Sequence, residues 1–215
     1  MVLPALLQGL SSKYTTAGKA GFITSMDIVI VPIILLFLKR KVGSFTWIGV
    51  VIAGFGLYLL CITDGFTIQL GDGLVMACAV CYSFQILLID HYAEKVDPIK
   101  LSFLQYMLCG VLSGIFMLIF ETVAIQDIVD CAVPILYTAI LEVTVAFTLQ
   151  IIGQKDTPPA IAAIIMSMEA VFSAVSGALF LGEIMSSREL AGCILMMVAF
   201  IIIQIPTGRK SSQNL

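Results

Sequence analysis

Charge is scarce in this sequence. Asp, Glu, Lys and Arg make up 12% of its 215 residues, whereas apolar residues make up 60%, and the mean hydropathy is +1.09. Soluble domains average about a quarter charged and about half apolar residues, and they need polar side chains to cover their surface. The composition excludes a soluble globular protein and predicts an all-α integral membrane protein. The net charge of -3, without a basic block, gives no indication of nucleic-acid binding.

Motifs for catalysis and metal binding are missing as well. The chain has a single histidine, His91, and it contains no GxSxG, HExxH or Walker motif. Cys78 and Cys81 form a CxxC inside a helical run, without a second pair or a nearby histidine, and thiols there behave as small hydrophobes. We therefore expect no metal, no cofactor and no enzymatic activity. An intramembrane protease or lipid-modifying transferase stays as the alternative of another class.

Long apolar runs fill most of the chain, and the short connections between them carry nearly all the charge. A helix needs about 20 predominantly apolar residues to cross the hydrocarbon core of a bilayer. By this criterion the sequence predicts a bundle of about seven transmembrane helices, at about residues 20–38, 45–63, 73–91, 100–120, 132–153, 160–181 and 188–206.

Lysine and arginine gather in alternate connections. An alternating path through the membrane brings most of them to one side, and an excess of these residues marks the cytoplasmic side. We therefore expect the C-terminus in the cytoplasm and the protein as a multi-pass protein of the plasma membrane. The residues concerned are Lys39, Arg40, Lys41, Lys95, Lys100, Lys155, Arg209 and Lys210.

Two distant segments of the chain repeat one another. Sliding the sequence by 142 residues matches Gln8 with Gln150, and it places Asp27 on Glu169, which has the same charge. Because the two copies would enter the membrane from opposite sides, the sequence predicts an inverted-topology repeat, which is typical of secondary transporters with a substrate site near the midplane. Further matches are Lys13 with Lys155, Thr15 with Thr157, Ser25 with Ser167 and, with one more residue, Gly49 with Gly192.

A family resemblance rests on the stretches YTTAGKAGFITSMDIVIVP, GDGLVMACAVCYSFQILLIDHYAEKVDPIKLSFLQ and TPPAIAAIIMSMEAVFSAVSGALFLGE. They are similar to the EamA-like permeases of the bacterial drug/metabolite transporter superfamily, and the likeness runs from about Gln8 to Pro206. The resemblance implies a fold of ten helices in two five-helix inverted repeats, with both termini in the cytoplasm. It also implies export or exchange of small metabolites, amino acids or drugs.

On this resemblance, the chain begins at the end of the family's third helix and is the remnant of a ten-helix transporter. Residues 1–63 are then the C-terminal part of the first repeat, 64–206 the second repeat of five helices, and 207–215 a cytoplasmic tail. Three possibilities stay open: a working transporter, an inactive truncated fragment or gene model begun at an internal methionine, and a short chain that forms a homodimer to complete the bundle.

Three carboxylates stand inside apolar runs: Asp27, Glu142 and Glu169. Ionisable residues within a span are costly and usually face the bundle interior or a water-filled cavity. The family that the chain resembles usually has uncharged residues where Asp27 and Glu142 stand. A carboxyl group can bind and release a proton, so we expect these residues to bind substrate or to couple transport to protons. Pairing with interfacial donors is the alternative for Asp27 and Glu169.

Amides also lie inside the expected spans, as Gln85, Gln105 and Gln150. An amide offers both a donor and an acceptor, which suits recognition of a polar substrate, but it can equally join helices. Gln85 and Gln150 are therefore candidates for substrate binding, whereas a structural role is favoured for Gln105.

Pro32 removes a backbone donor from the first span and predicts a kink that could act as a hinge. Gly110 and Gly114 form a GxxxG that would let helices pack closely. The leading hypothesis is a secondary transporter, an exporter or exchanger, in which one repeat rocks against the other around a midplane cavity.

Overall fold

The computed structural model describes residues 2–11, 17–62, 70–93, 95–120, 126, 129, 131–180, 182 and 185–204. These residues contain helices and short connections, and no strand occurs among them. The expected all-α class is therefore confirmed. The helices are α1 (Val2–Ser11), α2 (Ala17–Thr24), α3 (Asp27–Phe37), α4 (Ser44–Cys61), α5 (Leu70–Ala93), α6 (Pro98–Phe120), α8 (Ala132–Tyr137), the π-helix η1 (Thr138–Ala146), α9 (Phe147–Gln154), α10 (Pro159–Phe180) and α11 (Ser187–Ile203).

The apolar runs form membrane-spanning helices close to where the sequence predicts them. The seventh expected span corresponds to α11, whose 17 residues lie at the short end of spanning length. The chain is thus a multi-pass membrane protein. Among the described residues, six stretches are long and apolar enough to cross a membrane: Ala20–Phe37, Ser44–Cys61, Gly71–Ala93, Pro98–Phe120, Ala132–Gln154 and Pro159–Phe180.

Capping interactions set where several helices begin. At the start of α11, Ser186 and Glu189 form a capping box, in which Ser186 Oγ accepts the Glu189 N–H and the Glu189 carboxylate accepts the Ser186 N–H at 2.7 Å. At the start of α6, Asp97 Oδ1 accepts the Ile99 N–H at 2.9 Å, and Pro98 is the first helical residue.

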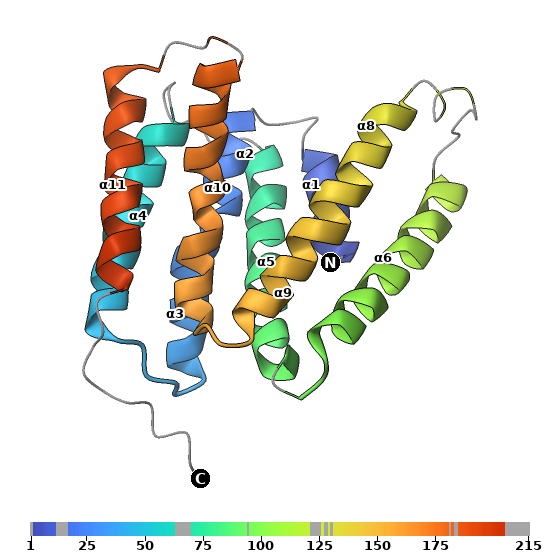
Figure 1. The fold of residues 1–215 in the computed structure, drawn as a ribbon, viewed down its shortest axis with the longest axis horizontal. Coiled ribbons are helices and arrows are strands. Elements are labelled where there is room, and N and C mark those ends of the chain that lie inside the picture. Colours follow the sequence, from blue (N-terminus) through green and yellow to red (C-terminus); the bar gives the residue numbers. More distant parts are fainter. Residues whose placement is uncertain are drawn as a thin grey trace.

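The helices α3, α4, α10 and α11 share one apolar core and lie together on one side of the molecule (Figure 1). Val50 and Leu57 of α4 are buried in this core with Met196 and Ala199 of α11. The two helices α4 and α11 pack along most of their length. This pair forms the most closely packed part of the described fold.

The central helix is α5, which contacts α1, α2, α3, α9 and α10. Beyond it, α6 and the arm formed by α8, η1 and α9 lie on the far side from α4 and α11 (Figure 1). These outer elements bury little: Ser102 is the buried residue of α6, and neither α8 nor η1 buries any. Their apolar side chains face outward, as in helices that meet lipid.

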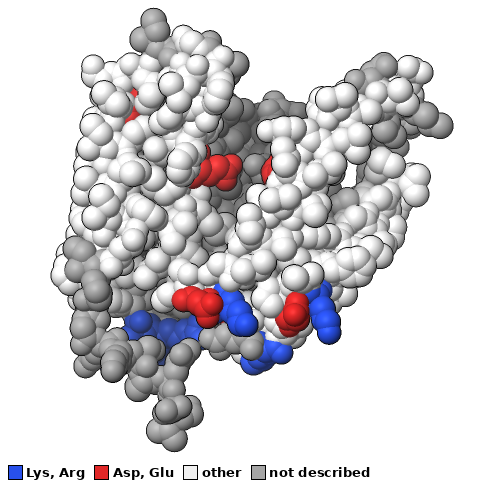
Figure 2. Space-filling model, in the orientation of Figure 1, with Lys and Arg blue, Asp and Glu red and all other residues white. Residues whose placement is uncertain are grey.

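Charged side chains gather at one end of the bundle, where Figure 2 shows Lys, Arg, Asp and Glu together. At this end Arg40, just after α3, pairs with Asp90 near the end of α5, with 2.5 Å between Arg40 Nη1 and Asp90 Oδ2. The connections from α3 to α4, from α5 to α6 and from α9 to α10 contain most of the basic residues expected on the cytoplasmic side.

Candidate functional site

A hollow separates α10 from the arm formed by α8, η1 and α9, and acidic side chains lie on both of its walls (Figure 2). Each of these elements contains one acidic residue, Glu169 in α10 and Glu142 in η1. The two carboxylates are close enough to repel one another electrostatically. Both side chains are exposed, which means that other parts of the described chain do not cover them and that they face open space.

Tyr82 of α5 lies within electrostatic range of both walls of the hollow. Its hydroxyl donates to Gln8 Oε1 of α1 at 3.0 Å. It is also within electrostatic range of Glu142, Glu169 and Cys109 of α6. Four elements besides α5 therefore converge on this phenol. Nothing in the sequence singles out Tyr82, because a tyrosine in an apolar run carries no signal of its own.

Asp27 begins α3 at an interruption in the first span. The Thr24 hydroxyl bonds back to the Ala20 carbonyl oxygen at 2.8 Å, and such bonds compete with the helical ladder and bend helices. Asp27 is 8% exposed, and its Oδ1 has no hydrogen-bond partner. It lies within electrostatic range of Glu169, its counterpart in the repeat that the sequence predicts. Two of the expected carboxylates thus approach each other from α3 and α10.

Glu142 lies in the middle of the π-helix η1. The Thr144 hydroxyl bonds to the Ala139 carbonyl oxygen at 2.8 Å, five residues back, which fits the wider turn of a π-helix. Single π-turns inside α-helices occur frequently at functional sites. The span thus deviates from α-helical geometry at the point where it presents its one carboxylate.

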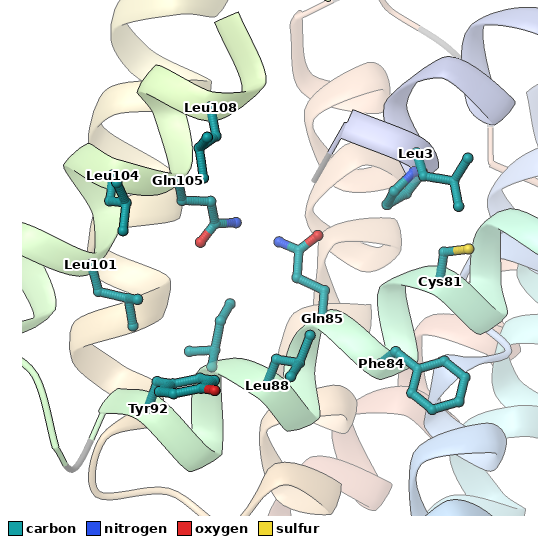
Figure 3. A pocket seen from close by; sticks show the side chains of 12 residues that line it. Leu3, Cys81, Phe84, Gln85, Leu88, Tyr92, Leu101, Leu104, Gln105 and Leu108 are labelled. Atoms are coloured by element: carbon teal, nitrogen blue, oxygen red, sulfur yellow. The ribbon is translucent and has the colours of Figure 1, made fainter. Parts of the chain in front are cut away.

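A lateral groove of about 440 Å³ lies between α1, α5 and α6. Gln85 of α5 and Gln105 of α6 extend toward one another across it, among leucine side chains (Figure 3). Gln85 is 8% exposed, and its Oε1 has no hydrogen-bond partner. Both amides therefore line one groove, and the substrate-binding role of Gln85 and the structural role of Gln105 stay predictions.

The remaining candidates lie apart from this group. Gln150 is half-buried on α9 and does not line the groove. Pro32 is buried in α3, which continues through it, and the interruption of the span lies at Ser25 and Met26 instead. A Cβ atom added to Gly110 or Gly114 would have no neighbouring atom of the described chain within 4 Å, so neither glycine makes a close helix contact within it. The hinge and packing roles of these three residues stay predictions.

The CxxC has a structural contact. The Cys78 thiol donates to the Pro4 carbonyl oxygen at 3.2 Å and so ties α5 to α1. Within the described part of the chain, no three His, Cys, Asp or Glu side chains are placed to hold a metal ion.

Comparison with known proteins identifies a family to which the chain is similar. The model of the EamA-like transporter family matches residues 69–205. An uncharacterized transporter of Archaeoglobus fulgidus is 34% identical over 204 residues, which are 92% of this chain and 64% of that protein. The chain thus spans about two thirds of the length of this relative.

A solved crystal structure of a protein has the same fold, with a TM-score of 0.76 over 94% of this chain and 73% of its own, at 16% identity. At that identity the likeness concerns the fold alone. The family match covers more than half of the chain and agrees with the helical bundle and its membrane spans. The chain belongs to the EamA-like transporter family.

Proposed function

We propose that the chain acts as a secondary transporter, an exporter or exchanger of small metabolites, amino acids or drugs, and not as an enzyme. The observation that carries the proposal is the hollow between α10 and η1, which has carboxylates on its walls inside the membrane-spanning region. Ionisable groups within spans commonly mark substrate or ion pathways. The family and the name of the relative support the same reading.

The contacts between α4 and α11 support a two-fold relation between the repeats. Gly56 lies against Gly192, and Gly49 lies near Ala199. The offset of 143 residues that matches Gly49 with Gly192 also matches Gly56 with Ala199. If the two copies are exchanged, the contact between Gly56 and Gly192 becomes the contact between Ala199 and Gly49, as a two-fold axis requires. The mechanism proposed is alternating access, in which the two copies rock about this crossing and open the hollow to one side at a time.

The gathering of basic residues at one end supports an orientation in the plasma membrane. Lys39, Arg40 and Lys41 follow α3, and Lys95 and Lys155 lie in the connections after α5 and α9. By the positive-inside rule this end lies in the cytoplasm. The hollow is then the route between this end and the opposite side.

Counterflow in proteoliposomes tests the transport activity. Vesicles containing the purified chain are loaded with an unlabelled panel of amino acids, amines and organic acids, and uptake of each labelled compound is measured. We expect saturable uptake of at least one compound, and we expect Glu169→Gln to reduce it about tenfold or more through loss of a charged contact. The matched control is Asp156→Asn, the same chemical change at an exposed turn after α9.

Folded protein that gives no saturable counterflow with any compound of the panel would contradict the proposal. An equal loss of uptake in Asp156→Asn and Glu169→Gln would contradict the assignment of the site to the hollow. Folding of each variant is checked by its elution as a single species from a size-exclusion column.

A further inference from the structure

Among the side chains that the structure describes, the charged groups around the hollow are all acidic. Glu142 and Glu169 repel one another, and Asp27 lies within electrostatic range of Glu169. The basic side chains that the structure describes lie instead at helix ends or in connections: Lys39, Arg40, Lys41, Lys95, Lys100, Lys155 and Arg188. Uncompensated negative charge inside a membrane protein is unfavourable. A positively charged ligand would supply the missing compensation.

The buried polar atoms that lack partners give a second and independent indication. Within the described residues, three of the four such atoms are hydrogen-bond acceptors in or near spans: Asp27 Oδ1, Gln85 Oε1 and Gln154 Oε1. The fourth, Arg188 Nε, belongs to the first turn of α11. Buried polar groups without partners are costly in an apolar interior. Of these three atoms, Gln85 Oε1 belongs to a residue that lines a cavity, so a ligand there would meet an acceptor that an N–H or O–H donor can satisfy.

The groove beside the hollow gives room for an organic body. Cys81 lines the groove, and the next residue, Tyr82, lies within electrostatic range of both glutamates. The helix α5 is therefore a wall of both spaces. The unpartnered amide oxygen of Gln85 belongs to this groove, whose other walls are mostly leucine (Figure 3). A volume of about 440 Å³ is in the range of small-molecule sites.

We propose that the site binds organic amines in their protonated form. The ammonium N–H groups donate to the carboxylates of the hollow, chiefly Glu142 and Glu169, and the apolar body of the amine lies in the groove beside Gln85. Alkylamines are protonated at neutral pH, as the lysine side chain is. This inference rests on the proposed function, since it takes the hollow as the substrate site.

Equilibrium binding to the purified chain in lipid nanodiscs tests the inference, with 2-phenylethylamine as the probe. Its N-methyl, N,N-dimethyl and N,N,N-trimethyl derivatives lose the N–H donors one by one while the positive charge stays. We expect affinity to fall along this series, and we expect 3-phenylpropionate and 3-phenylpropanol to bind about tenfold more weakly or worse than the amine, because both lack the charge-assisted contact.

Substitutions of the two glutamates test whether their carboxylates contact the ammonium group. Glu142→Gln and Glu169→Gln should each weaken binding of 2-phenylethylamine about tenfold or more, whereas Glu169→Asp, which keeps the charge, should retain part of the affinity. Asp156→Asn should bind as the wild type does. Thermal unfolding of each variant in the same nanodiscs shows that it is folded, and if one glutamine variant does not fold, the other decides.

If the trimethylammonium compound binds as tightly as 2-phenylethylamine, the role of N–H donors is overturned. If 3-phenylpropionate binds as tightly as the amine, or if both glutamine variants bind the amine as tightly as the wild type does, the cation site is overturned. No binding of any amine would overturn the inference as a whole. Saturable counterflow of an acid or a neutral compound, without amine binding, would leave the proposed transport in place and reject the amine site. Amine binding without counterflow of any compound would support the amine site and contradict the proposed transport.

Discussion

Gly56 of α4 and Gly192 of α11 meet backbone to backbone where the two helices cross. A Cβ atom placed on Gly192 would lie 2.7 Å from the Gly56 carbonyl oxygen, and one placed on Gly56 would lie 3.0 Å from the Gly192 carbonyl oxygen. Real Cβ atoms do not approach backbone oxygen as closely as the first of these distances. Glycine at both positions therefore sets the separation of the two helices, as small residues do at helix crossings in membranes.

Gly192→Ala should destabilise the protein by about 1–3 kcal/mol, because the added methyl group must push α4 and α11 apart. The matched control is Gly54→Ala in α4, where nothing lies within 4 Å of the new Cβ. There alanine should be neutral or should stabilise the helix by up to about 1 kcal/mol. Thermal unfolding in detergent micelles measures both changes. Equal melting temperatures for the two variants would contradict the close crossing.

The positions of the spans could be predicted from the sequence, because long apolar runs have few alternatives to crossing a bilayer as helices. The irregularities inside them could not. The interruption at Ser25 and Met26 and the π-helix around Glu142 accompany hydroxyl-to-backbone bonds of Thr24 and Thr144. Such bonds are available to any threonine in a helix, so the sequence alone does not indicate which ones deform it.

The candidate site was predicted in part. Asp27, Glu142 and Glu169 stand out in the sequence because a carboxylate inside an apolar run is costly, and the structure brings them into electrostatic range of one another or of a shared neighbour. Tyr82 could not be predicted, because its place depends on α1, α6, η1 and α10 converging on α5. The position of Gln85 opposite Gln105 across the groove depends in the same way on how α5 and α6 pack.

Ser186→Ala should destabilise the start of α11 by about 1 kcal/mol, because it removes the side-chain half of the capping box with Glu189. Ser187→Ala, at the next and also exposed position, leaves the box intact and should change stability little. Thermal unfolding compares the two variants. A larger loss in Ser187→Ala than in Ser186→Ala would contradict the capping geometry.

The ion pair between Arg40 and Asp90 should contribute little, because the arginine side chain is 56% exposed. A double-mutant cycle with Arg40→Gln and Asp90→Asn should give a coupling energy of about 0.2–1 kcal/mol, as measured for exposed pairs, and the coupling should shrink as salt is added. The same cycle with Lys41→Gln in place of Arg40→Gln should give no coupling. Coupling of equal size for both cations would show that Asp90 responds to the general field of this end and not to Arg40.

Water should reach the carboxylate positions of the hollow in the membrane-embedded protein. In a variant that lacks the six native cysteines, Glu142→Cys and Glu169→Cys should each react with a charged, membrane-impermeant maleimide, because maleimides need a thiolate and thiolates form only where water solvates them. The control is Val51→Cys. Val51 lies near the middle of α4, and its side chain is 69% exposed but lies away from the hollow.

The comparison separates the two kinds of exposure that a helix in a membrane can have. Val51 and Glu169 are both uncovered by protein, yet a position that faces hydrocarbon keeps its thiol protonated and unreactive, whereas one that faces a water-filled hollow does not. Labelling of all three positions at one rate, or of Val51→Cys alone, would contradict a hollow open to water.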